Sequence, residues 1–152
     1  MEIGDLMMKW KDNGTDFEFT IDEFYKHKDW CEVTLMVKNK YFNYYQKEEL
    51  LETRDVQQIL DGITRLLNRK MIKREVLHFT EPDISFAFYP PRLQREVSHW
   101  ISLENIDSLT PLFAEMIIEL DLGEGYGGEY YVVEMSQDQL IMMRDYLLEV
   151  TG

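Results

Sequence analysis

Three glycines near the C-terminus, Gly123, Gly125 and Gly128, have the G-x-G-x-x-G spacing of a phosphate-binding loop. Such a loop holds a pyrophosphate only where a helix follows the glycines, because the helix N-terminus supplies the amide donors. Here the run EYYVVEM follows, and its aromatic and β-branched residues favour a strand. No Lys or Arg lies between residues 108 and 143, so a phosphate would meet only negative charge. The glycines therefore predict a hairpin turn without nucleotide affinity.

Histidines and paired carboxylates are the other candidates for chemistry. His27, His78 and His99 have no zinc-binding spacing, so we expect no metal and no cofactor. Glu81 and Asp83 lie two residues apart, as acid–base work or a metal would require, and His78 is close in sequence. The proline between the two carboxylates instead suggests the entry to a strand. A pocket near these three residues remains the alternative site.

Length and composition predict one globular domain over residues 1–152, with 45% hydrophobic residues in a chain of 152. The first ten residues do not resemble a secretory signal, and no apolar run is long enough to span a membrane. Cys31 is the only cysteine, so no internal disulfide forms and a buried thiol is expected. These features favour a cytoplasmic protein.

Charge is unevenly spread along the chain. The net charge is −13, from 29 acidic and 16 basic residues. Residues 101–152 contain 11 of the acidic residues and a single base, Arg144. Such a segment repels nucleic acid and anionic membranes and attracts basic proteins. Acidity that serves only solubility, as in a housekeeping domain, is a further alternative.

Alternating apolar residues predict several strands, and helical spacing predicts two helices. Helices are expected over residues 53–67 and 136–150, with Thr53 and Ser136 as N-caps and Gln139 completing a capping box. The basic run 65–74 is expected to end the first helix, or else to bind an anion. The strand stripes are Cys31, Val33, Leu35 and Val37; Ile84, Phe86 and Phe88; Val97, His99, Ile101 and Leu103; and Met116, Ile118, Leu120 and Leu122.

The two helical segments belong to an internal repeat. Residues 32–67 align with residues 115–150 at a constant offset of 83, without a gap, so that strand meets strand and helix meets helix. Each unit reads as a hairpin followed by a helix. The predicted fold class is therefore α+β, a largely antiparallel β-sheet with two helices.

The hairpin around the glycines predicts an acidic surface. If Leu122 pairs with Glu129, then Leu120 faces Tyr131 on the buried side and Glu119 faces Val132 on the exposed side. A register slip of one residue would invert this assignment. The residues expected to bind a partner are Glu115, Glu119, Asp121, Glu124, Tyr126, Glu129, Tyr130 and Glu134.

Three stretches in the middle of the chain carry a family resemblance: DWCEVTLMV (29–37), LLETRDVQQIL (50–60) and HFTEPDISFAF (78–88). They resemble the WapI-type immunity proteins, whose box is similar to Phe-x-Glu-Pro-Asn-Leu-x-Phe. Asp83 and Ile84 stand where that box has Asn and Leu, and Arg54 and Asp55 also depart from the family pattern. The resemblance covers residues 24–150. It implies immunity to a wall-associated contact-dependent bacterial toxin, and it assigns no binding residues.

Taken together, these features predict a non-enzymatic binding protein, an immunity protein that occludes a basic toxin domain with an acidic surface. The alternative is a small enzyme or ligand-binding domain with a pocket near Glu81, Asp83 and His78. Neither nucleic acid nor membrane is expected as a partner, and no cofactor is expected.

Overall fold

The computed structural model describes residues 8–12, 14–24, 29–91, 111–120 and 129–152. The predicted stripe 97–103, His27, His99 and the three glycines lie outside these residues. The helices and strands occur in the order β1 (Met8–Asp12), β2 (Thr15–Glu23), β3 (Trp30–Lys38), β4 (Asn43–Glu52), α1 (Thr53–Leu67), β5 (Glu75–His78), β6 (Ile84–Tyr89), β7 (Phe113–Leu120), β8 (Glu129–Met135) and α3 (Gln137–Thr151).

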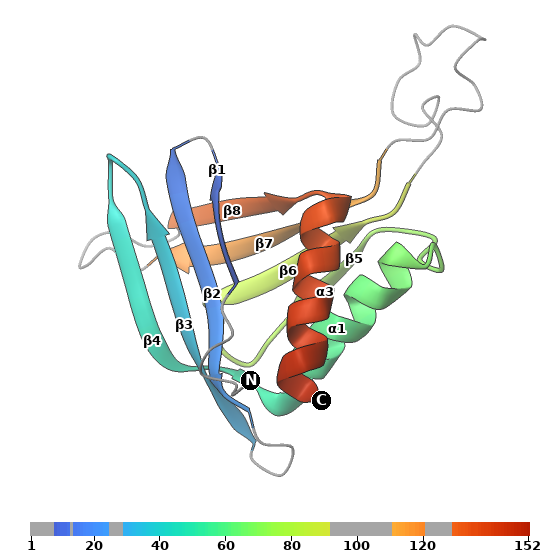
Figure 1. Ribbon diagram of the computed structural model, residues 1–152, viewed down its shortest axis with the longest axis horizontal. Helices are drawn as coiled ribbons and strands as arrows, with labels where there is room; N and C mark the ends of the chain where they lie inside the picture. Colours follow the sequence, from blue (N-terminus) through green and yellow to red (C-terminus); the bar gives the residue numbers. More distant parts are fainter. Residues whose placement is uncertain (1–7, 13, 25–28, 92–110, 121–128) are drawn as a thin grey trace, which may run out of the picture.

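The α+β fold class is confirmed, but the strands form two sheets where the sequence suggested one. Each sheet is a four-stranded antiparallel meander, β1-β2-β3-β4 and β5-β6-β7-β8. In Figure 1 the strands of the first sheet run steeply at the left, whereas those of the second run across the picture behind α3. Both helices contact the second sheet, α1 against β6 and α3 against β7 and β8, and the helices contact each other.

The internal repeat appears in the order of the elements. Among the described residues, each half contains four antiparallel strands, the last of which is followed directly by a helix. At the offset of 83, the bounds of β3 and α1 fall within one residue of those of β7 and α3. The hairpin-plus-helix units predicted at residues 32–67 and 115–150 are thus the last two strands and the helix of each half.

The predicted apolar stripes form the inner faces of the sheets. Hydrophobic residues from both halves make one buried cluster, to which both helices contribute. The buried members of the predicted strand stripes are Cys31, Val33, Leu35, Val37, Ile84, Phe86, Phe88, Met116, Ile118 and Leu120. The apolar residues that recur at helical spacing in the two predicted helices are also buried, except for Leu60 and Leu67, which are partly buried. Leu66, which was not among them, is buried as well.

Contacts between segments far apart in the sequence join the first sheet to the second half. The backbone N–H of Ile21 in β2 donates to the hydroxyl of Tyr146 in α3 at 2.7 Å. The rings of Phe42 and Tyr131 meet edge to face with centroids 6.1 Å apart. Because these contacts link segments far apart in the sequence, the first sheet packs against the layer formed by the second sheet and its helices.

The predicted register of the β7–β8 hairpin is wrong by two residues. Glu129 pairs with Leu120, not with Leu122, and Glu119 pairs with Tyr130. Eight residues separate the two strands, two more than the six-residue loop expected from the glycines. Side chains alternate with a period of two, so an even shift leaves each residue on its predicted face. The predicted division into a buried side and an exposed side is therefore unchanged.

The bounds of α1 agree with the predicted residues 53–67, but its N-cap differs from the prediction. The N-cap is Glu52, whose backbone N–H donates to Asp55 at 2.8 Å, and Thr53 is the first helical residue. The helix ends at Leu67, so most of the basic run lies beyond it. In α3, by contrast, the predicted capping box of Ser136 and Gln139 is confirmed.

Candidate functional site

The acidic surface predicted from the sequence lies on the outer face of the second sheet. Strand alternation places twelve residues on this face, which we name the second-sheet outer face. They are Val76, His78, Ser85, Ala87, Tyr89, Phe113, Glu115, Ile117, Glu119, Tyr130, Val132 and Glu134.

Cross-strand rows define the chemistry of this face. Glu115 lies opposite Glu134, and Ile117 lies opposite Val132 in the next row. Tyr130 and Val132 expose 59% and 46% of their surface in neighbouring rows of this face. The face thus combines a central apolar row with carboxylates on both sides of it, as at many protein–protein interfaces.

One carboxylate of the face is held in a hydrogen-bonded network. The hydroxyl of Tyr89 donates to Glu115 at 2.7 Å, and the guanidinium of Arg74 lies 5.2 Å from the centre of the Tyr89 ring. The hydrogen bond to Glu115, together with burial, raises the pKa of Tyr89 against an opposing contact from Arg74. Phe113 stacks on Tyr89 with ring centroids 4.5 Å apart, so the position of Glu115 is well defined.

The other two carboxylates have no such partner. Within the described part of the chain, neither Glu119 nor Glu134 forms an ion pair or a side-chain hydrogen bond. Glu134 also stands directly opposite the like charge of Glu115, an arrangement that destabilises a sheet. A cation from another molecule would relieve this repulsion.

Of the remaining predicted partner-binding residues, the structure describes only one. Glu129 is exposed but pairs with the buried Leu120, so alternation assigns it to the opposite face from Tyr130. It therefore does not belong with the other carboxylates on the second-sheet outer face. Asp121, Glu124 and Tyr126 lie outside the described residues, and their membership of the site stays a prediction.

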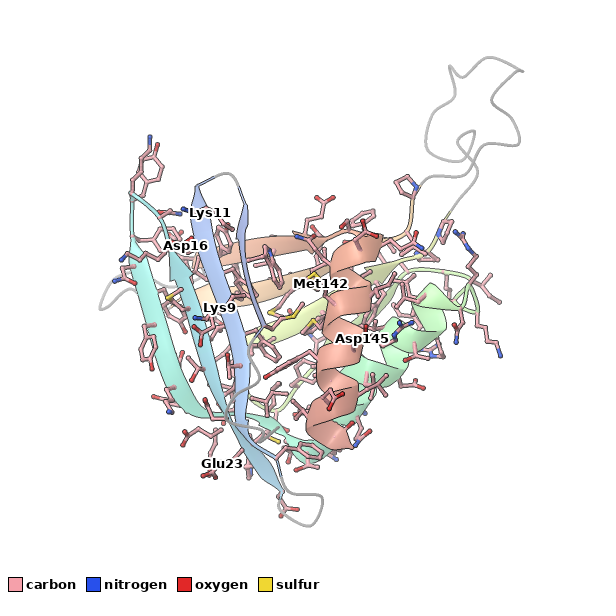
Figure 2. All side chains as sticks on the ribbon, viewed as in Figure 1. Lys9, Lys11, Asp16, Glu23, Met142 and Asp145 are labelled. Carbon is pink, nitrogen blue, oxygen red and sulfur yellow. The ribbon has the colours of Figure 1, made fainter. Side chains whose placement is uncertain are left out.

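The outer face of the first sheet has a different character. Lysines and carboxylates form ion pairs across its strands, Lys9 with Glu18 at 3.8 Å and Lys11 with Asp16 at 3.6 Å. Lys9, Lys11 and Asp16 lie along β1 and β2 in Figure 2. On the same face, Lys47 in β4 forms an ion pair with Glu32 in β3 at 3.6 Å. Six charges on this face are thus paired within the sheet, whereas Lys38 and Glu49 form no ion pair among the described residues.

The alternative site near Glu81, Asp83 and His78 has little geometric support. Glu81 and Asp83 lie in the turn between β5 and β6, not along one face of a strand, and His78 is exposed. Among the described residues, no group of three His, Cys, Asp or Glu is arranged to hold a metal ion. Two surface cavities of about 290 and 260 Å³ are lined by other residues, the larger between α1 and β6 and the smaller beside the β3–β4 turn.

Cys31 is buried, as predicted, and burial raises the pKa of its thiol. The thiolate needed for a nucleophile is thereby disfavoured. Neither helix of the described part of the chain is long and apolar enough to cross a membrane.

Several residues of the site were not predicted from the sequence. Tyr89, Phe113 and Val132 join the carboxylates only because β6, β7 and β8 are neighbours in one sheet. The basic run that contains the exposed Ile72 was predicted to end the first helix or else to bind an anion, and Ile72 itself was not singled out. Its position within a run of four bases was the signal that could have revealed a surface feature.

Comparison with known proteins supports the family resemblance. No curated protein matches the chain. The model of the immunity protein WapI-like family matches residues 7–150, nearly the whole chain. The box that carried the resemblance forms the β5–β6 hairpin, where Phe79 packs edge to face on Phe86 at a centroid distance of 6.5 Å. The chain therefore belongs to the immunity protein WapI-like family.

Proposed function

We propose that this protein is a non-enzymatic immunity protein that binds a bacterial toxin domain and neutralises it by occlusion. The observation that carries the proposal is the family match over residues 7–150. An immunity protein of this kind acts in the cytoplasm of the cell that it protects, by stoichiometric binding and not by turnover.

The second-sheet outer face is the surface that we assign to this binding. Protein interfaces combine apolar anchors at the centre with polar groups at the rim, and the anchors supply most of the affinity. Tyr130 and Val132 fit the role of anchors, because both are exposed on a rigid strand. Glu119 and Glu134 fit the role of steering groups, because neither has a cation beside it among the described residues.

The proposed toxin surface is basic. A toxin whose active site binds a polyanion such as nucleic acid carries cations at that site, and a carboxylate-rich face would cover them. Complementary charge speeds association and excludes wrong partners, whereas shape and apolar contacts set the dissociation rate. The two kinds of residue on the face are therefore expected to act on different rate constants.

The test measures binding kinetics with the toxin domain encoded beside this gene. The double variant Glu119→Lys/Glu134→Lys is expected to associate ~10-fold more slowly at low salt, with little difference at high salt. Its matched control is Glu49→Lys/Glu149→Lys, which changes the net charge equally on other surfaces. The Tyr130→Ala variant is expected to dissociate ~10-fold or more faster, as for a hot-spot loss of ~2 kcal/mol.

Tyr45 provides the control for the tyrosine, because it is exposed on the outer face of the first sheet. Neither variant on the second sheet is expected to lose more than ~0.5 kcal/mol of stability. If these variants bind with unchanged kinetics and substitutions of Glu81 or Asp83 abolish binding, the toxin-binding site would instead be the β5–β6 turn.

A further inference from the structure

The loop between α1 and β5, residues 68–74, presents an isoleucine to solvent among four cations. We name it the basic loop; its cations are Arg69, Lys70, Lys73 and Arg74. Ile72 exposes 91% of its surface, more than any other large hydrophobic residue that the structure describes. A single exposed apolar side chain is common on protein surfaces, so the features that indicate a contact surface are the cations around Ile72 and the second-sheet outer face nearby.

The conformation of the basic loop is fixed at both ends. The N–H of Lys70 donates to the carbonyl of Arg65 at 2.9 Å, and the N–H of Arg69 donates to that of Leu66 at 3.1 Å. This is the Schellman pattern that ends a helix, with Arg69 at φ 59° where glycine is the usual residue. Met71 is buried in the core beside it, so Ile72 is held outward on an anchored segment.

At the far end, the guanidinium of Arg65 makes two hydrogen bonds to Glu75, at 2.7 and 3.0 Å. Arg65 is thereby occupied within the molecule. In contrast, Arg69, Lys70 and Lys73 form no ion pair with any part of the chain that the structure describes. The charges of Arg69 and Lys70 are therefore available to another molecule, and that of Lys73 is available in part, because it also helps to lower the pKa of Glu75.

We propose that the basic loop docks on the second-sheet outer face of a second copy of this chain, forming a symmetric dimer. The loop leads into β5, and Val76 begins a cross-strand row that ends at Glu115 and Glu134. With ~4.8 Å between strands, the loop lies roughly 10–15 Å from those carboxylates, at the same end of the sheet. Arg74 joins the two regions, because it lies over the ring of Tyr89, which hydrogen-bonds Glu115.

The same surface therefore contains the basic loop, with Ile72 exposed on it, and the carboxylates of the second-sheet outer face, which flank an apolar row. Such a surface is self-complementary about a two-fold axis, since each loop can meet the other copy's carboxylates. Ile72 would cover the exposed Val132 and Ile117, and Lys70 and Lys73 would neutralise Glu134 and Glu115. The high net negative charge does not prevent this contact, because charges beyond about 8 Å are screened at physiological salt.

A second copy accounts for both sides of the surface at once, which an anionic lipid surface does not. The dimer and the proposed toxin complex use the same face, so the toxin would have to displace the second copy. The dimer itself does not rest on the toxin's identity, and it is measured with the purified protein alone. Failure of one proposal therefore leaves the other standing.

The test is sedimentation equilibrium of the full chain over a range of concentrations at low and high salt. The wild type is expected to dimerise, more weakly at high salt. Ile72→Glu and Lys73→Glu are each expected to weaken dimerisation at least ~10-fold, as loss of an apolar anchor or of a paired charge does at other interfaces. Leu148→Glu is the matched control for Ile72→Glu, because Leu148 is 52% exposed on α3, and it is expected to dimerise normally.

Charge exchange supplies the decisive measurement. Lys73→Glu and Glu134→Lys are each expected to be monomeric alone, and an equal mixture of the two is expected to form a mixed dimer, because both contacts are then attractive. A wild type that is monomeric throughout overturns the proposal, as does a dimer that survives Ile72→Glu. Monomers that sediment with phosphatidylserine vesicles would also overturn it, by assigning the basic loop to an anionic lipid surface.

Discussion

The two sheets share one topology but present opposite kinds of outer face. Both place a glutamate on the third strand directly opposite a glutamate on the fourth, Glu32 with Glu49 and Glu115 with Glu134. In the first sheet Lys47 reaches Glu32 at 3.6 Å. At the offset of 83, the position of Lys47 is occupied by Tyr130, an exposed aromatic residue.

The difference separates what folding requires from what binding requires. Both inner faces are continuous with one core, so their apolar pattern is constrained in the same way. The outer faces contribute little to that core and are free to differ. Where charges are paired within the sheet, the face has no need of a partner; where they are unpaired beside exposed apolar groups, a partner is expected.

The largest effects are expected where the two halves are alike. Phe19 in β2 and Phe86 in β6 are both fully buried. Replacing either with alanine is expected to lower the free energy of unfolding by ~3–5 kcal/mol, through lost transfer energy and a cavity. Because both residues belong to one core, each variant is expected to unfold in a single transition, measured in urea by tryptophan fluorescence and circular dichroism.

The prediction would be contradicted by two separate unfolding transitions, if each substitution shifted only the transition of its own sheet. The sheets would then be independent folding units, and the prediction of a single domain over residues 1–152 would fail.

An intermediate effect is expected at the contact that joins the halves. Tyr146→Phe removes the acceptor of the buried N–H of Ile21 and is expected to cost ~1–3 kcal/mol of stability. Tyr130→Phe is the control, because the Tyr130 hydroxyl lies on an exposed side chain and its loss should leave stability unchanged.

The same contact predicts a dependence on alkaline pH. Burial raises the pKa of Tyr146 to about 12, from a usual value of 10.0. The folded state therefore favours the neutral phenol, and its contribution is complete below the unfolded-state pKa and is lost as pH rises towards 12. Urea titrations between pH 9 and pH ~12 should show a larger loss in the wild type than in Tyr146→Phe, because the raised pKa of Tyr89 contributes equally to both proteins. Parallel profiles would contradict the assignment.

The sequence predicted the features that follow from periodicity. The bounds of α1 agree with residues 53–67, and the strand stripes such as Cys31 to Val37 are buried as expected. Glu115, Glu119, Tyr130 and Glu134 also share one face as expected, because the register error at the β7–β8 hairpin was an even number of residues. These predictions succeeded because alternation and helical spacing are local properties.

Features that depend on long-range contacts could not be predicted from these local patterns. Nothing in the spacing of the strands indicated that β4 and β5 belong to different sheets. The N-cap at Glu52 was missed because Thr53 is the more usual capping residue, and the hydrogen bond from the Glu52 N–H to Asp55 was not predicted. The role of Tyr89 in holding Glu115 depends on the pairing of β6 with β7, which joins residues 26 positions apart.

The smallest effect tests the comparison of the outer faces directly. Glu134→Gln removes a like charge opposite Glu115 and is expected to raise the free energy of unfolding by ~0.2–1 kcal/mol. Glu49→Gln makes the matching change opposite Glu32, where Lys47 already compensates the charge, so a smaller gain or none is expected. Urea unfolding of both variants at low and high salt measures the difference, which salt should reduce because exposed charges are screened. Equal effects from the two substitutions would mean that the carboxylates of the second sheet are no less compensated than those of the first. A gain confined to Glu134→Gln, accompanied by weaker toxin binding, would instead identify Glu134 as a charge kept for recognition at the expense of stability.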